Sequence, residues 1–60
     1  MRILLADHQA QSRLTIKMQL AGKLEFDLVS EAVDAREALA LADKLRVDLS
    51  LIDHDLPGKS

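Results

Sequence analysis

The chain alternates short apolar runs with longer segments in which apolar residues recur at helical spacing. Residues 3–6 form a continuous apolar run that stops at Asp7, which is typical of a strand buried on both faces of a parallel sheet. Residues 26–32 alternate apolar and polar side chains imperfectly, as strands at the edge of a sheet do. A third strand is predicted within residues 47–53, centred on residues 49–52.

An amphipathic helix is predicted between the first two strands, within residues 9–23. Leu14, Met18 and Ala21 recur at i, i+4 and i+7, so we expect this stripe to pack against the core, with Ile16 and Leu20 flanking it. Gly22 is well placed to end the helix.

A second helix is predicted over residues 34–46. Asp34 can act as its N-cap, and Glu37, three residues later, completes a pattern similar to a capping box. Three apolar residues form the stripe that we expect to face the core: Ala38, Ala42 and Leu45. Leu39 and Leu41 are expected to widen it.

The order β-α-β-α-β predicts an α/β fold with a parallel sheet, because parallel strands need crossover connections. Two doubly wound strand orders are common, flavodoxin-like and Rossmann-like. The Rossmann-like order is usually accompanied by a glycine-rich turn after the first strand, but residues 6–12 contain no glycine. We therefore predict one partial flavodoxin-like domain over residues 1–60, with a three-stranded parallel sheet in the order 2-1-3 and two helices.

Composition and charge narrow the possible functions. The net charge is −2, which disfavours nucleic acid as a partner, and no apolar run is long enough for a membrane span or a signal peptide. Cysteine is absent, so thiolate metal sites and disulfides are excluded. Phe26 is the only aromatic residue, so the core must be aliphatic. We expect a cytoplasmic protein.

Two acids end neighbouring strands in the predicted order. Asp7 follows the first strand and Asp53 follows the third, so both carboxylates are expected at the carboxyl edge of the sheet, where open α/β sheets bind ligands. Paired carboxylates suit Mg²⁺, and a carboxylate beside Mg²⁺ can act as a nucleophile toward phosphorus. Asp7 has an alternative role as a cap for the first helix.

Together these pieces resemble the first half of a receiver domain of two-component response regulators. The resemblance implies that Asp53 is the phosphoacceptor for a histidine kinase, that the domain is not an enzyme, and that Asp7, Asp53 and the main-chain carbonyl of Asp55 hold Mg²⁺. The matching pieces span nearly the whole chain: residues 2–8, Arg13, residues 31–42 and residues 47–58.

Two departures from the receiver pattern affect these expectations. Receivers usually carry two adjacent acids after the first strand, but the second position here is His8, so we expect weak Mg²⁺ binding. The switch Thr/Ser and the phosphate-binding Lys of the family belong to later strands, and Lys59 does not match that lysine. We therefore expect an N-terminal fragment of a longer protein that holds no stable aspartyl phosphate by itself.

Alternative interpretations remain open. His8 favours a pseudo-receiver that binds partners without taking phosphate. A half-domain could also form a homo-oligomer through the third strand, whose outer edge would otherwise lack a partner. A zinc or nickel site formed by His8 and His54 with Asp7 and Asp53 is disfavoured, because strand alternation should point His54 away from Asp53. We expect solvated histidines.

Overall fold

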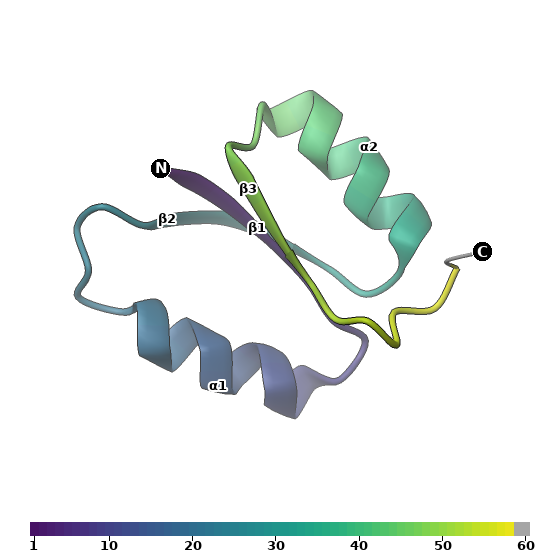
Figure 1. Cartoon of the computed structure of the whole chain (residues 1–60), viewed down its shortest axis with the longest axis horizontal. Helices are drawn as coiled ribbons and strands as arrows, with labels where there is room; N and C mark the ends of the chain where they lie inside the picture. The colour runs from purple at the N-terminus through teal and green to yellow at the C-terminus, as the bar shows by residue number, and fades with distance from the viewer. Residues whose placement is uncertain (59–60) are drawn as a thin grey trace.

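The computed structural model describes residues 1–58, so Lys59 and Ser60 lie outside the described residues. The predicted order of elements is confirmed (Figure 1). The elements, in chain order, are β1 (Arg2–Ala6), α1 (Ala10–Leu20), β2 (Asp27–Ala32), α2 (Ala35–Leu45) and β3 (Leu49–Ile52).

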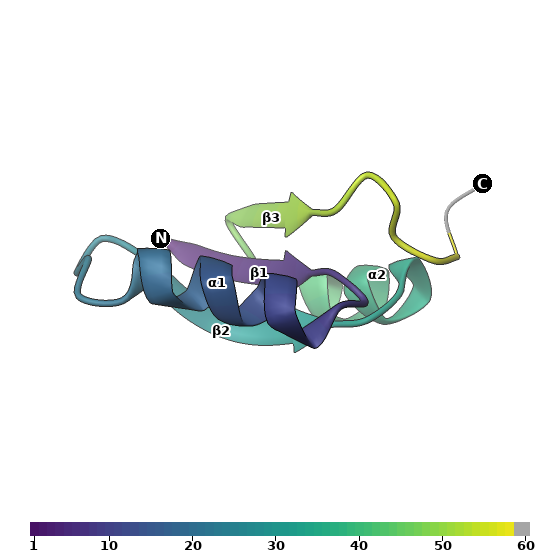
Figure 2. The same cartoon turned by 90° about the horizontal axis from the view of Figure 1, so that it is seen from below.

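The strands form a parallel sheet in the order β2-β1-β3, which confirms the predicted 2-1-3 arrangement (Figure 2). β1 is central, and its residues Ile3 to Ala6 are fully or almost fully buried. This position explains the continuous apolar run, since a central strand has no face that water reaches. The register places Ala6 opposite Ala32 on one side and Ile52 on the other, so the three strands end at the same edge.

The two helices cover opposite faces of the sheet (Figure 1). The α2 face holds the larger core, to which half-buried Leu41 and Ala42 of α2 add their side chains. Its buried members come from β1, β2, α2 and the turn after β3: Leu4, Ala6, Ala32, Ala38 and Leu56. The predicted stripe of α2 is confirmed, with Ala38 buried and Ala42 and Leu45 half-buried. Leu39 was wrongly expected to widen it, since this residue is 75% exposed.

The predicted core stripe of α1 was wrong. Leu14 is 47% exposed and Met18 is 70% exposed, and no residue of α1 is fully buried. Ala21 is also exposed. The half-buried apolar residues of this helix are instead Ile16 and Leu20, on another face.

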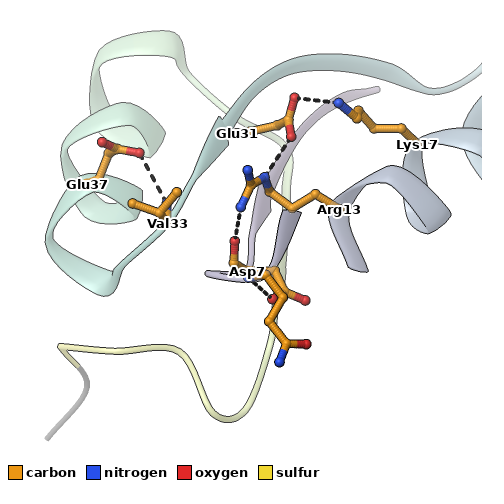
Figure 3. A network of polar contacts seen from close by, with 7 residues as sticks. Asp7, Arg13, Lys17, Glu31, Val33 and Glu37 are labelled. Carbon is orange, nitrogen blue, oxygen red and sulfur yellow. Dashed lines mark hydrogen bonds and ion pairs between the residues drawn. The ribbon is translucent and has the colours of Figure 1, made fainter. Parts of the chain in front are cut away.

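Polar contacts account for this orientation of α1. Arg13 and Lys17 lie on the same face as Ile16 and Leu20, and both cations bind the carboxylate of Glu31 on β2 (Figure 3). The helix therefore turns the face that carries these two cations toward the sheet.

The ends of the helices largely follow the sequence signals. The Asp34 carboxylate accepts a hydrogen bond from the Glu37 amide at 2.8 Å, which confirms Asp34 as the N-cap of α2. α1 ends at Leu20, and Gly22 follows with a positive φ of 81°, as expected for a glycine just past a helix end. Neither helix within residues 1–58 has the length and apolar character required to cross a membrane.

Candidate functional site

Asp7 is held firmly where β1 ends. Its amide donates a hydrogen bond to the Ala32 carbonyl at 3.0 Å, and its Oδ1 accepts one from the Gln9 amide at 2.9 Å. The residue is only 6% exposed. The other carboxylate oxygen of Asp7 makes no hydrogen bond among the described residues. Since no buried side-chain oxygen or nitrogen of these residues lacks a hydrogen-bond partner, that oxygen must reach the surface.

Asp7 does not cap α1 as the alternative proposed. Gln9 occupies the N-cap position, but its side chain accepts a hydrogen bond from Ser12 Oγ at 3.1 Å and none from a helix amide. Asp7 accepts a hydrogen bond from the amide of Gln9 itself. The Asp7 carboxylate therefore shapes the turn before the helix and leaves the amides of the first helical turn alone.

Asp53 lies beside Asp7 at the carboxyl edge of the sheet. The Asp53 amide donates to the Ala6 carbonyl at 2.9 Å, which ties the first residue after β3 to the end of β1. Ligand atoms of Asp7, His8 and Asp53 lie within 4.8 Å of one another. The predicted meeting of Asp7 and Asp53 is thus confirmed, and His8 joins them from the exposed side.

The predicted direction of His54 was wrong. His54 Nδ1 lies 3.7 Å from Asp53 Oδ1, and Nε2 lies 3.4 Å from Asp55 Oδ2, although the His54 side chain is 88% exposed. Strand alternation does not apply here, because β3 ends at Ile52 and the following residues form a turn. Asp53, His54 and Asp55 therefore make a second, more exposed group of possible metal ligands.

Asp55 lies at the exposed margin of the site. Its side chain is 74% exposed, and its amide points toward Asp53 Oδ1 at 3.4 Å. The metal-binding role of its main-chain carbonyl stays a prediction.

Arg13 links the loop that carries His8 to the sheet (Figure 3). Its Nη1 donates to the Asp7 carbonyl at 2.7 Å, while its Nε donates to Glu31 Oε1 at 2.9 Å. Lys17 Nζ binds the other Glu31 oxygen at 3.1 Å. The pKa of Glu31 is lowered from its ordinary value, mainly because its carboxylate accepts a hydrogen bond from Lys17 and also because it accepts one from Arg13. Through Arg13, this network holds the main chain at Asp7 in place.

Leu56 and Pro57 anchor the loop after β3, and the sequence analysis missed both. Leu56 is 3% exposed in the α2 core, and its amide donates to the Asp53 carbonyl at 3.0 Å. The Pro57 carbonyl accepts from the Ala35 amide at 2.8 Å, at the start of α2. The available signal was Leu56 itself, an aliphatic residue inside an otherwise polar turn.

A hollow lies between α1 and β3, beside both carboxylates. Its walls are mainly apolar, and its polar end is formed by Asp7 and Asp53. Leu5, Ile16, Leu20 and Leu51 are among the residues that line it. The site therefore consists of two carboxylates and one imidazole at the mouth of an open apolar hollow.

Comparisons with protein-family models, with curated proteins and with solved structures found no match to this chain. The functional assignment therefore rests on the residues of the chain and on the geometry in which they lie.

Proposed function

We propose that the chain is a receiver module of two-component signalling, in which Asp53 accepts a phosphoryl group from a histidine kinase. The observation that carries this proposal is the position of Asp53, one residue past the end of β3 and beside Asp7. Open α/β sheets bind ligands at this edge, between adjacent strands whose connections leave in opposite directions. β1 and β3 are neighbours in the sheet. α1 leaves β1 over one face and α2 leads into β3 over the other (Figure 1), which is the arrangement expected at such a point.

The proposed step is a phosphoryl transfer to carboxylate. An oxygen of Asp53 attacks the phosphorus of a phosphohistidine, and the bond between phosphorus and the donor imidazole nitrogen breaks. The electron pair stays on that nitrogen, and the product on Asp53 is an acyl phosphate. The Asp53 side chain is 23% exposed, which supports approach by an external donor.

Mg²⁺ fits this site only in part. Asp7 and Asp53 supply the carboxylate oxygens that Mg²⁺ prefers, and Mg²⁺ would neutralise charge on the incoming phosphoryl group. His8 occupies the place of a third oxygen ligand with a nitrogen, so we propose weak binding, with a dissociation constant of about 1 mM or higher.

The proposal is tested by trapping the acyl phosphate. The chain is incubated with acetyl phosphate and Mg²⁺ and then reduced with borohydride, which converts an aspartyl phosphate to homoserine before it hydrolyses. Peptide mass mapping should find homoserine at position 53 in the unmodified chain and in the control Asp55→Asn. It should find none in Asp53→Asn. Absence of homoserine at position 53 in the unmodified chain contradicts the proposal.

A second candidate function is assembly through the β3 edge, by which two copies pair. Within residues 1–58, β3 pairs with β1 on one side, and no strand pairs with its other side. Leu49 and Ile52 are 41% and 52% exposed. An uncovered strand edge with apolar side chains is a template for pairing with another chain, and closed two-fold dimers are the commonest assemblies.

A further inference from the structure

The ligand atoms gathered at the sheet edge do not form a magnesium set. Asp7 and Asp53 offer carboxylate oxygens and His8 offers an imidazole nitrogen, all within 4.8 Å of one another. Mg²⁺ requires oxygen ligands in near-ideal octahedral geometry, whereas imidazole suits zinc, copper, iron and nickel. One nitrogen and two carboxylates therefore favour a transition metal over Mg²⁺.

Asp7 is the preorganised ligand of this set. One carboxylate oxygen accepts a hydrogen bond from the Gln9 amide at 2.9 Å, and the other reaches the surface. A carboxylate oxygen of Asp7 lies within 4.8 Å of ligand atoms of His8 and Asp53. Arg13 holds the carbonyl of the same residue at 2.7 Å. Hydrogen bonds of this kind orient metal ligands and raise the affinity of a site.

We propose that Asp7, His8 and Asp53 bind a divalent transition-metal ion such as Zn²⁺ or Co²⁺ in preference to Mg²⁺. Three protein ligands leave a coordination position for water or for a phosphate oxygen, as in zinc sites that are not purely structural. This inference deepens the proposed function, because Asp53 is both a ligand and the proposed phosphoacceptor. Metal binding is nevertheless measurable without any phosphoryl donor.

The neighbouring group of Asp53, His54 and Asp55 is the competing site. Its members His54 and Asp55 have side chains that are 88% and 74% exposed, whereas Asp7 of the proposed site is buried and held by the Gln9 amide. Fixing exposed side chains in one conformation costs entropy, which favours the site that contains Asp7. The two groups share Asp53 and differ in the histidine and in the second carboxylate, so variants of His8 and His54 distinguish them.

The experiment is calorimetric titration of the 60-residue chain with Zn²⁺ and with Mg²⁺, using the unmodified chain, His8→Asp and His54→Asp. Both histidines are exposed, so neither change should disturb folding, and amide spectra without metal verify this. We expect the unmodified chain to bind Zn²⁺ at least about tenfold more tightly than Mg²⁺. His8→Asp should weaken Zn²⁺ binding by about tenfold or more and strengthen Mg²⁺ binding, and His54→Asp should change neither greatly.

A second readout identifies the ligand directly. Co²⁺ is paramagnetic, so it should broaden the ring signals of His8 before those of His54. Equal Zn²⁺ affinity in His8→Asp, loss of Zn²⁺ binding in His54→Asp, or tighter binding of Mg²⁺ than of Zn²⁺ would each overturn the inference. Trapping of homoserine at position 53 is scored separately, so a failed metal result leaves the phosphoacceptor proposal standing, and the converse also holds.

Discussion

Glu31 on β2 is the residue on which two cations of α1 converge. Its carboxylate accepts hydrogen bonds from Lys17 and Arg13, and Arg13 in turn holds the carbonyl of Asp7. The charge of Glu31 therefore supports the position of Asp7, the first of the proposed metal ligands.

We expect the contribution of Glu31 to stability to depend on pH. Its pKa in the folded chain is lowered from the ordinary value of 4.5, chiefly by the hydrogen bond from Lys17. A lowered folded pKa stabilises the fold above the unfolded pKa, and this contribution is lost as the pH falls through the folded value. Denaturant unfolding of the unmodified chain and Glu31→Gln should show a difference in the free energy of unfolding at neutral pH that shrinks below about pH 4.5.

Glu25→Gln is the control for this measurement, because Glu25 is exposed and its side chain makes no ion pair within residues 1–58. It should cost less than Glu31→Gln at neutral pH. A Glu31→Gln effect that persists unchanged in acid would contradict the ion-pair explanation.

Gly58 and Gly22 form a matched pair for testing the loop that carries Asp53. Both have positive φ, at 88° and 81°, so alanine at either position costs about 1–2 kcal/mol in backbone strain. A Cβ at Gly58 would make ordinary van der Waals contact with Ala35, 3.4 Å from its amide nitrogen, whereas one at Gly22 meets nothing within 4 Å. Gly58→Ala and Gly22→Ala should therefore lower the free energy of unfolding by similar amounts, as measured by denaturant unfolding. A much larger loss in Gly58→Ala would mean that the loop cannot accept a side chain against α2.

The positions of site residues at the ends of strands were predicted correctly, and those in the turn after β3 were not. The meeting of Asp7 and Asp53 follows from strand order alone. The position of His54 does not, because alternation ceases once β3 ends at Ile52. Leu56 was missed because its burial depends on the start of α2, which lies about twenty residues earlier in the chain.

At the level of elements, α2 is specified locally by its cap and by a clear stripe. Asp34→Ala removes the hydrogen bond to the Glu37 amide, so we expect the free energy of unfolding to fall by about 1 kcal/mol. Thermal or denaturant unfolding measures this change. Asp43→Ala, in the same helix but exposed, should cause no loss. A similar loss in both variants would argue against a capping effect.

The orientation of α1 could not be predicted from apolar spacing. The helix offers two apolar rows, one through Leu14 and Met18 and one through Ile16 and Leu20. Apolar spacing does not decide between the two rows, and cations usually face solvent, so Arg13 and Lys17 give no sign that their face packs against the sheet. The carboxylate of Glu31 determines which face of α1 turns toward the sheet, because it pairs with both cations. Glu31 lies on β2, which follows the helix in sequence.

For the whole molecule, strand order was the strongest prediction. The apolar run of β1 required a central strand, and the absence of glycine after it removed the main support for the Rossmann-like order. What covers the outer edge of β3 could not be deduced in the same way, because pairing between chains depends on a second surface.

The assembly proposal predicts a specific response to charge. Sedimentation of the unmodified chain should show association that increases with concentration, and Ile52→Lys should shift it to monomer, because a lysine would be desolvated at the paired edge. Met18→Lys is the control, since Met18 is 70% exposed on the outer surface of α1. Circular dichroism confirms that both variants are folded. A folded monomer in the unmodified chain, or equal dissociation in both variants, would contradict assembly through β3.

The hydrogen bond from the Ala35 amide to the Pro57 carbonyl connects the loop that carries Asp53 to the start of α2. Three residues separate Asp53 from Pro57. The segment is held at both ends by main-chain hydrogen bonds and between them by buried Leu56. A displacement of Asp53 by a bound ion or a phosphoryl group would therefore pull on the first turn of α2. On the opposite face, α1 is anchored on Glu31 and contacts the site at Asp7 through Arg13. A displacement of Asp53 and a displacement of Asp7 would thus be transmitted to different faces of the sheet.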